Sequence, residues 1–398
     1  MQQLWELAQE EKKRVVEWRR QLHQHPELSF EEFETAEFVA ERLTELGYDV
    51  RRNVGGTGVL ATLDTGRPGP VIAFRADMDA LPIQEQTGLP FASAKPGVMH
   101  GCGHDIHTAV LLGTAVLLDK LRPELRGIIK LIFQPGEEAN GGARCVIQDG
   151  VLQNPDVQAV FALHVLPDLP AGTIGVKEGY LSATDDELLI RVNGVSAHSS
   201  TPQEGVNAIT AAAHILTALE SIESCAISPF EVATCSICKI RAGETNNVIP
   251  DRAELWGMLR CLDKNTKALY RERIQRICAG TAHALGAEAE VEFTTGFPAV
   301  HNDPELTRQA AAAAVHVLGG EDRVIWLPRP NLGSEDFSYF QEEVPGVMFA
   351  LGCGNQEGVG GGLHAADFAP DESCIPVGMA CHAAIALSLC GGADEQAK

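Results

Sequence analysis

The chain has 398 residues, which predicts two domains because a single hydrophobic core rarely serves more than roughly 250–300 residues. Hydrophobic residues make up 45% of it, enough for a large buried core. The 31 basic and 54 acidic side chains give a net charge of −23, which disfavours nucleic acids and anionic membranes as partners.

The first 20 residues are charged and amphipathic, without the apolar centre of an export signal, and no apolar run reaches the roughly 20 residues that span a bilayer. Eleven cysteines are scattered along the chain, as is typical of a reducing compartment. We therefore expect a cytoplasmic protein. Cys235 and Cys238 form a C-x-x-C pair of the kind seen in redox and zinc sites, but their apolar, strand-like surroundings favour a structural role.

Helical periodicity predicts helices over residues 3–24 and 31–47, separated by the segment HQHPELSF with its proline at position 26. We interpret His23 and His25 in this segment as part of a polar turn rather than as metal ligands. Residues 59–63 and 71–75 are predicted to be neighbouring strands joined by the turn TGRPGP. Asp77 and Asp79 follow the second strand, at the end where open α/β sheets build their sites.

The stretch MHGCGHDIH, residues 99–107, contains two candidate metal ligands. Cys102 and His104 are two residues apart, so in an extended segment their side chains point to one side. Glycines at 101 and 103 allow the backbone to bend closely around an ion. An apolar helix is expected to follow.

Two buried strands are predicted next, each with a polar residue at or near its end. Residues 128–134 read as a central parallel strand and lead into QPGEE. There, Glu137 and Glu138 could hold a metal and face a substrate, or could form a solvated acidic turn. Residues 159–165 carry His164, which is either a ligand or a core histidine with an internal partner.

The pattern changes near residue 181. Strands at about 187–192, 230–240, 253–260 and 289–293 alternate with helices ending near 219 and spanning 266–285. This β-α-β-β-α-β order predicts a ferredoxin-like α+β module at residues 182–297. We expect it to be inserted into an α/β domain that comprises residues 1–181 and 298–398 and has a mixed sheet with helices on both faces. That domain resumes with a helix at 304–318, a strand at 347–351 and a last helix at 375–389.

The candidate ligands are too many for one tetrahedral zinc, which takes four. They are Cys102, His104, Glu138, His164 and His364. Two ions that share a bridging ligand account for all five, and such pairs generate a hydroxide nucleophile at neutral pH. Glu137 adjoins a ligand and is suited to act as general base, with His107 and Asp105 next in line. The predicted reaction is hydrolysis of an amide or ester.

Eight segments together resemble one family of enzymes: RADMDALP, MHGCGHD, FQPGEE, LHV, HSSTPQEGVNAI, NNVIPD, GSEDF and GLH. They look like the aminoacylase/carboxypeptidase family of dinuclear metallohydrolases. Within it they resemble the hippurate hydrolases, N-acetyl-diaminopimelate deacetylases and plant indoleacetyl-amino acid hydrolases. The segments occur in order over essentially the whole chain.

The resemblance implies that Cys102 bridges two divalent ions. His104 and His164 would complete one ion, and Glu138 and His364 the other. It also implies Glu137 as the base, and Asp79 as a carboxylate that orients a ligand without binding metal. Zinc or manganese is expected, with cobalt and nickel as further candidates.

The same resemblance implies that the inserted module is a lid that mediates homodimerisation. It would lend His198 to the partner subunit's site, where this histidine would stabilise the tetrahedral oxyanion. Asn247 and Arg260 match positions that contact the substrate. Asp77 and Gln203 depart from the family pattern, because many relatives have histidine at these positions, and Gln203 puts the shape of the substrate pocket in doubt.

The expected activity is hydrolysis of the amide bond of N-acyl amino acids by metal-activated water, with Glu137 as general base. A carboxypeptidase or dipeptidase acting on unblocked peptides is the alternative enzyme. A metal-storage protein would not need Glu137, and a scaffold descended from an enzyme would be expected to have lost at least one ligand.

Overall fold

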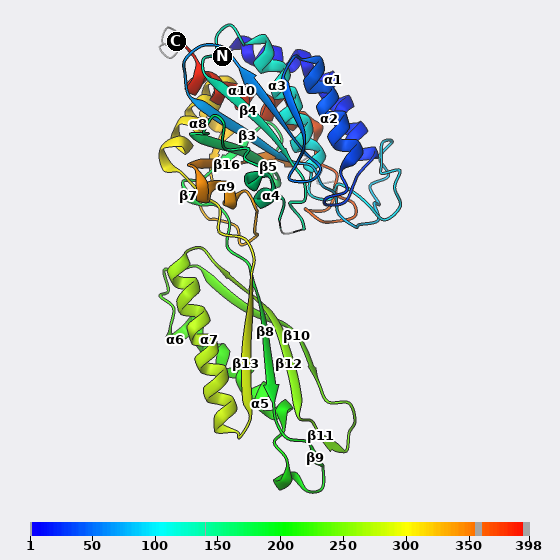
Figure 1. Ribbon diagram of the computed structural model, residues 1–398, viewed down its shortest axis with the longest axis vertical. Helices are drawn as coiled ribbons and strands as arrows, with labels where there is room; N and C mark the ends of the chain where they lie inside the picture. Colours follow the sequence, from blue (N-terminus) through cyan, green and yellow to red (C-terminus); the bar gives the residue numbers. More distant parts are fainter. Residues whose placement is uncertain (1, 140, 355–359, 393–398) are drawn as a thin grey trace. The chain divides into compact units, whose positions relative to one another are not determined.

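The computed structural model describes residues 2–139, 141–354 and 360–392, and the chain forms two compact units (Figure 1). The first lies within Met1–Leu181, His301–Arg329 and Asp336–Lys398, and the second comprises Ser182–Val300 and Pro330–Glu335. The sequence analysis assigns residues 330–335 to the first domain. They group with the second unit, where Gly333 O accepts a hydrogen bond of 3.0 Å from Ala183 N.

The first unit contains an eight-stranded sheet in the order β1-β2-β4-β3-β5-β16-β6-β15. The strands are β1 (Asp49–Val54), β2 (Gly58–Asp64), β3 (Val71–Asp77), β4 (Ile128–Gln134), β5 (Ala159–Pro170), β6 (Ile174–Val176), β15 (Val324–Trp326) and β16 (Gly346–Gly354). β4, β3, β5 and β16 run parallel, whereas β1 with β2 and β2 with β4 are antiparallel. The fold is therefore a mixed α/β fold, as the sequence predicts.

The prediction that the strands at 59–63 and 71–75 are neighbours is wrong. β4 lies between β2 and β3, pairing antiparallel with one and parallel with the other. The turn TGRPGP does connect β2 to β3. It contacts the residue just before β4, because Gly127 O accepts hydrogen bonds from the N and Oγ1 of Thr65. A strand from later in the chain thus fills the position that a hairpin would have occupied.

The two faces of this sheet differ in polarity because side chains alternate along each strand. On β3, Ile72, Phe74 and Ala76 belong to the apolar core. Their face is covered by α3 (His104–Lys120), on which α1 (Gln2–Gln24) and α10 (Ile375–Cys390) pack. Arg75 alternates with these residues and so lies on the opposite face, whereas Asp77, the last residue of β3, contacts both Arg75 and His107 of α3.

The remaining helices of the first unit complete its packing. They are α2 (Phe33–Glu45) on β1 and β2, α4 (Gly142–Gln148) on β4 and α9, α8 (Pro304–Leu318) on β16 and α10, and α9 (Ser338–Glu343). The short strands β7 (Gly179–Tyr180) and β14 (His301–Asn302) pair with each other. Among the described residues, one helical stretch, Glu372–Cys390, is apolar and long enough to cross a membrane, but it is 78% buried and packs as a core helix.

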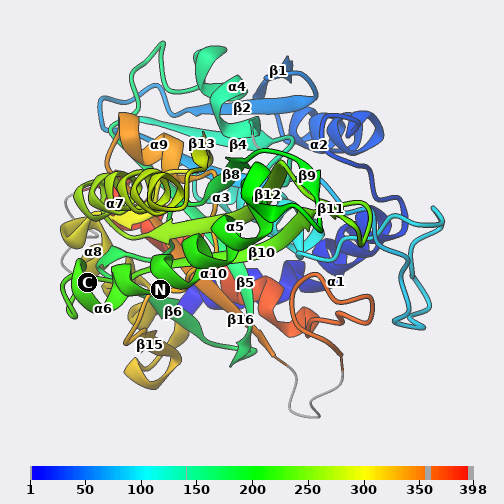
Figure 2. The same cartoon turned by 90° about the horizontal axis from the view of Figure 1, so that it is seen from below.

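The second unit has the predicted β-α-β-β-α-β order. It consists of β8 (Asp186–Asn193), α5 (Ala208–Leu219), β10 (Ala233–Ala242), β12 (Arg252–Cys261), α7 (Lys264–Ala284) and β13 (Glu288–Thr295), with a short helix α6 (Ser221–Cys225). The sheet order is β10-β12-β8-β13, and all neighbours are antiparallel. α5 and α7 lie side by side (Figure 2) and share a core with the sheet. β9 (Ala197–His198) and β11 (Val248–Ile249) form a separate two-stranded ladder.

Candidate active site

The candidate site lies at the carboxyl ends of three parallel strands, where open α/β sheets bring loop residues together. Asp77 ends β3, Gln134 ends β4 just before Glu137 and Glu138, and His164 lies on β5 beyond its pairing with β3. His104 is the first residue of α3. The turn before α3 needs glycine at 103, because its φ is 83° and a Cβ there would lie 2.4 Å from the Val165 side chain.

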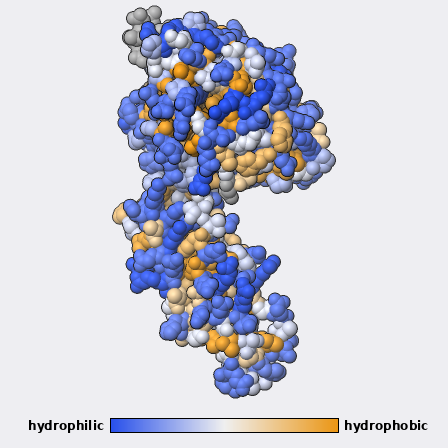
Figure 3. All heavy atoms as spheres, viewed as in Figure 1, coloured by the Kyte–Doolittle hydropathy of each residue, from blue (hydrophilic) through white to orange (hydrophobic). Residues whose placement is uncertain are grey.

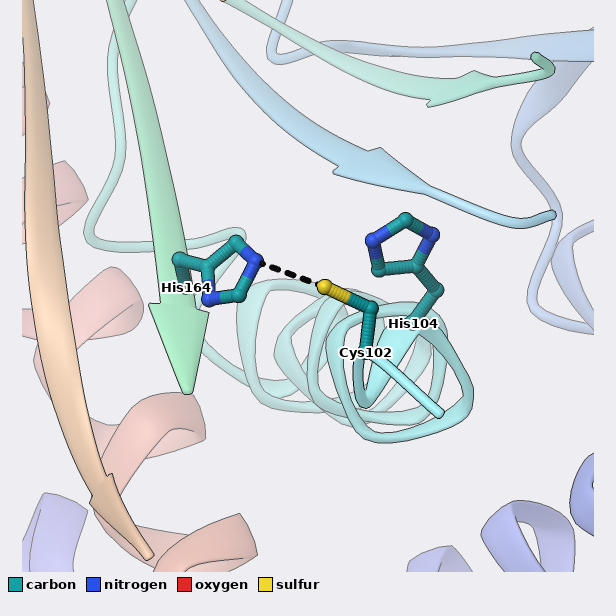
Figure 4. Close-up of side chains that lie close together, drawn as sticks. All are labelled: Cys102, His104 and His164. Atoms are coloured by element: carbon teal, nitrogen blue, oxygen red, sulfur yellow. Dashed lines mark hydrogen bonds between the residues drawn. The ribbon is translucent and has the colours of Figure 1, made fainter. Parts of the chain in front are cut away.

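Cys102, His104 and His164 form the first set of candidate ligands (Figure 4), with ligand atoms within 4.8 Å of one another. Cys102 Sγ lies 3.4 Å from His164 Nε2. Cys102 and His104 are buried, and His164 is half-buried. These are the thiolate and imidazole donors that borderline-soft divalent ions prefer.

Cys102, Glu138 and His364 form the second set, also within 4.8 Å. His364 Nε2 lies 3.3 Å from Cys102 Sγ and 3.3 Å from Glu138 Oε1. His364 has a φ of 65°, and its backbone N donates to Gly101 O, which ties its loop to that of the cysteine. The two sets share Cys102, so together they support binding of two divalent ions.

Hydrogen bonds prepare both histidines of the first set to accept a cation. His164 Nδ1 donates to Val165 O at 2.8 Å, and His104 Nδ1 lies 3.1 Å from the Asp79 carboxylate. In its neutral form each ring therefore presents the lone pair of Nε2 to the candidate site. His104 Nε2 is buried without a hydrogen-bond partner, a costly state that a bound cation would relieve. The residues thus fit the ions that the sequence predicts.

The surroundings of Cys102 favour the thiolate. Burial would raise the pKa of its thiol, but the charge of His164 and hydrogen bonds with three histidines lower that pKa to about 6. Hydrogen bonds with Cys102 and Glu138 in turn raise the pKa of His364 to about 10. A thiolate is the form of cysteine that binds metals.

Asp79 connects the two sets. One carboxylate oxygen contacts His104, and the other accepts hydrogen bonds from Glu138 N at 3.0 Å and Ser29 Oγ at 2.6 Å. Asp79 is 1% exposed, and its pKa is lowered by these hydrogen bonds in spite of burial. This geometry fits the orienting carboxylate that the sequence analysis expects at position 79.

Glu137, the expected base, lies beside the candidate ligands. Its ligand atoms lie within 4.8 Å of those of His104 and Glu138. The two alternatives are engaged elsewhere. His107 uses Nδ1 on Asp77 at 2.6 Å and Nε2 to accept from Val165 N, and Asp105 pairs with Arg19 and His23.

Sequence reasoning missed a buried charged network on the polar face of the sheet. Arg75 contacts Gln134 at 2.8 Å, Asp77 at 2.6 Å and Asp336 at 2.7 Å. The only signal of this network in the sequence was a charged residue, Arg75, directly after the apolar residues of β3. The interpretation of His23 as part of a polar turn is also incorrect, because this side chain is 1% exposed and packs in the Arg19–Asp105 network.

The second unit brings two of its three candidate residues together. His198 pairs with Val248, and Asn247 O accepts from Ser199 N at 3.0 Å. Arg260 lies eight residues along β12 from Arg252, the residue that begins this strand near Asn247. At about 3.3 Å per residue, Arg260 is roughly 25 Å from that end of the strand. Its guanidinium donates to Leu332 O.

The chain is similar in sequence and in fold to known proteins. The profile of peptidase family M20/M25/M40 matches residues 73–388. An N-acetylcysteine deacetylase of Bacillus subtilis is 42% identical over 94% of this chain and 96% of its own length, and thermostable carboxypeptidase 1 of Saccharolobus solfataricus is 38% identical over 94% of each. A dinuclear metal-binding M20 peptidase of B. subtilis has a similar structure, with a TM-score of 0.84, 39% identity and coverage of 94% and 97%.

These similarities define the class of this protein, which is a metal-dependent hydrolase acting on amide bonds. The chain belongs to peptidase family M20/M25/M40. The resemblance found in the sequence is therefore confirmed.

We predict that the metal-loaded protein holds two ions per chain and that Cys102→Ala loses most of both, because each ligand set depends on this sulfur. Elemental analysis of purified, dialysed protein measures this. Cys278→Ala is the control, since it removes a buried thiol of the second unit whose pKa burial raises to about 12. Saturation at one ion, or two ions in Cys102→Ala, would contradict the shared thiolate.

Proposed function

We propose that this protein hydrolyses the amide bond of small N-acyl amino acids. One observation carries the proposal: two ligand sets share a buried thiolate, and the Glu137 carboxylate lies beside them. The similarity to an N-acetylcysteine deacetylase over nearly the whole chain supports an acetyl or related acyl group on the substrate.

Cys102, His104 and His164 would hold one ion, and Cys102, Glu138 and His364 the other. Bound there, two divalent ions supply Lewis acidity at the reacting carbonyl and lower the pKa of water. Thiolate and imidazole donors favour zinc, and the carboxylate also suits manganese, with cobalt and nickel as further candidates. Asp79 keeps the ring of His104 oriented by holding its Nδ1.

Glu137 provides the proton transfers of the reaction. Its carboxylate takes a proton from the water that attacks the amide carbon, so the new C–O bond forms as the proton leaves. It then gives this proton to the amide nitrogen as the C–N bond breaks, releasing a carboxylic acid and an amino acid. One group serving as base and then as acid accounts for both steps.

A carboxypeptidase acting on unblocked peptides is the second candidate, supported by the 38% identity to a thermostable carboxypeptidase. We predict higher kcat/KM for N-acetyl, N-benzoyl or indoleacetyl amino acids than for unblocked dipeptides. A substrate panel assayed with zinc, manganese, cobalt and nickel measures it, and a chelator should abolish the activity reversibly. Preference for dipeptides would favour the carboxypeptidase, and no hydrolysis of either class would contradict an amidohydrolase.

We predict that Glu137→Gln retains both ions and lowers kcat by about 10²–10⁴-fold, because the amide oxygen cannot take the proton from water. Metal content and single-turnover kinetics are measured on the same preparation. Near-normal turnover in a fully loaded Glu137→Gln protein would assign the base to another group.

The second unit is proposed to be an inserted lid domain, residues 182–297, through which two chains form a homodimer. β10 and β13 are the sheet edges. β13 exposes Glu288 and Glu290, whose like charges disfavour pairing with a second copy, whereas β10 exposes Ile240. The neighbouring helix α5 exposes Ile209 and Leu216, and Figure 3 shows apolar side chains at the surface of this unit. These features support pairing through β10 and α5.

His198 is proposed to act on the partner subunit's substrate, with Asn247 beside it and Arg260 as a further substrate contact. His198 is exposed, and its Nδ1 accepts hydrogen bonds from Ser200 N and Oγ, which leaves Nε2–H as a donor for the oxyanion. His198 and Arg260 lie near opposite ends of one sheet, and a small N-acyl amino acid does not span it. This separation supports their serving different active sites.

We predict that His198→Ala keeps both ions and loses about 10²–10³-fold in kcat, the usual effect of removing an oxyanion donor. Mixing this variant with Glu137→Gln under subunit exchange should restore activity, because each mixed dimer contains one site with both residues intact. Demonstrated exchange without recovered activity would show that His198 does not act across the dimer.

A cytoplasmic location is proposed for the protein. It is supported by the scattered cysteines, all of which are free thiols in the structure.

A further inference from the structure

The segment Pro26–Glu32, between α1 and α2, contributes side chains that contact the candidate site, although the sequence suggests a polar turn. Glu32 is fully buried. Its Oε1 accepts hydrogen bonds from Gly136 N at 2.8 Å and Phe30 N at 2.9 Å, and its Oε2 accepts one from Thr57 Oγ1. A buried carboxylate that accepts three hydrogen bonds is held in one position.

The loop that carries Glu137 is held on both sides of this residue. Gly136 N donates to Glu32, and Glu138 N donates to Asp79. The same segment supports the second hold, because Ser29 Oγ donates to the Asp79 oxygen that Glu138 uses. The backbone of Glu137 therefore lies between two N–H groups, each fixed by a buried carboxylate.

Close packing accompanies these hydrogen bonds. Gly136 has a φ of 61°, and a Cβ there would lie 2.6 Å from the ring of Phe30. Phe30 itself has a φ of 63°, an unfavourable conformation for a bulky residue, which its bond to Glu32 helps to hold. A strained backbone conformation of this kind persists only where the surrounding contacts hold it in place.

We propose that Glu32 is a positioning residue that holds the Gly136–Glu138 loop so that Glu137 faces the substrate and Glu138 keeps its place in the metal site. This inference rests on the roles proposed above for Glu137 and Glu138. Glu32 acts on the loop through the hydrogen bond from Gly136 N, and its bonds from Phe30 N and Thr57 Oγ1 hold the carboxylate in place. A glutamine can reproduce them, since its oxygen accepts from Gly136 and Phe30 while its amide donates to the Thr57 hydroxyl, whereas an alanine cannot.

The experiment compares Glu32→Ala, Glu32→Gln and Glu27→Ala, each loaded with cobalt(II). Glu27 is the matched control, because it is a buried glutamate of the same segment whose carboxylate accepts from Thr35 N at 2.8 Å and does not contact the loop. The visible cobalt spectrum reports ligand geometry independently of activity. Thermal unfolding measures general destabilisation, and kcat and KM are measured with the best N-acyl amino acid.

Glu32→Ala should alter the cobalt spectrum and lower kcat by about 10²-fold with little change in KM, since a small misplacement of a catalytic group has an effect of that order. Glu32→Gln should restore both, and Glu27→Ala should change only the unfolding temperature. An unchanged spectrum and kcat in Glu32→Ala, equal losses in Glu27→Ala, or a Glu32→Gln protein as impaired as the alanine variant would each overturn the inference. If the wild-type protein hydrolyses no N-acyl amino acid, the proposed function fails, while the spectra still test Glu32.

Discussion

Charge buried away from water is the constraint on which this structure depends. A thiolate, several imidazoles and carboxylates converge at one sheet edge, and a charge in such a place is costly unless it is compensated. Protein partners compensate Asp77 through Arg75 and Asp105 through Arg19. Within the part of the chain that the structure describes, His104 Nε2 is buried without a hydrogen-bond partner, and Glu138 Oε1 is paired with His364 at 3.3 Å. Both are ligand atoms that bound cations would satisfy.

Local signals made much of this predictable. Apolar periodicity located α1, α8 and α10 within a few residues, and glycine-rich or acidic turns after apolar strands located Cys102, His104, Glu137 and Glu138. Strand pairing was harder, because β4 inserts between β2 and β3 through contacts distant in sequence. Glu32 gave no signal, since an acid just before a helix is commonplace and its partner Gly136 lies 104 residues away.

The second unit shows how the length of one strand determines which of its residues lie together. The β-α-β-β-α-β order was readable from alternating periodicities, but the separation of Asn247 from Arg260 follows from the length of β12. The acidic side chains of β13 and the apolar ones of β10 and α5 make the two edges unequal. Sheet edges that differ in this way are not equally open to pairing with another strand.

Asp79 has a consequence for both ligand sets. One of its oxygens holds a ligand of the first set, and the other holds the backbone of a ligand of the second. Any displacement of this carboxylate therefore disturbs a ligand of each set at once. Loss of the Asp79 side chain should weaken the binding of both ions rather than of one.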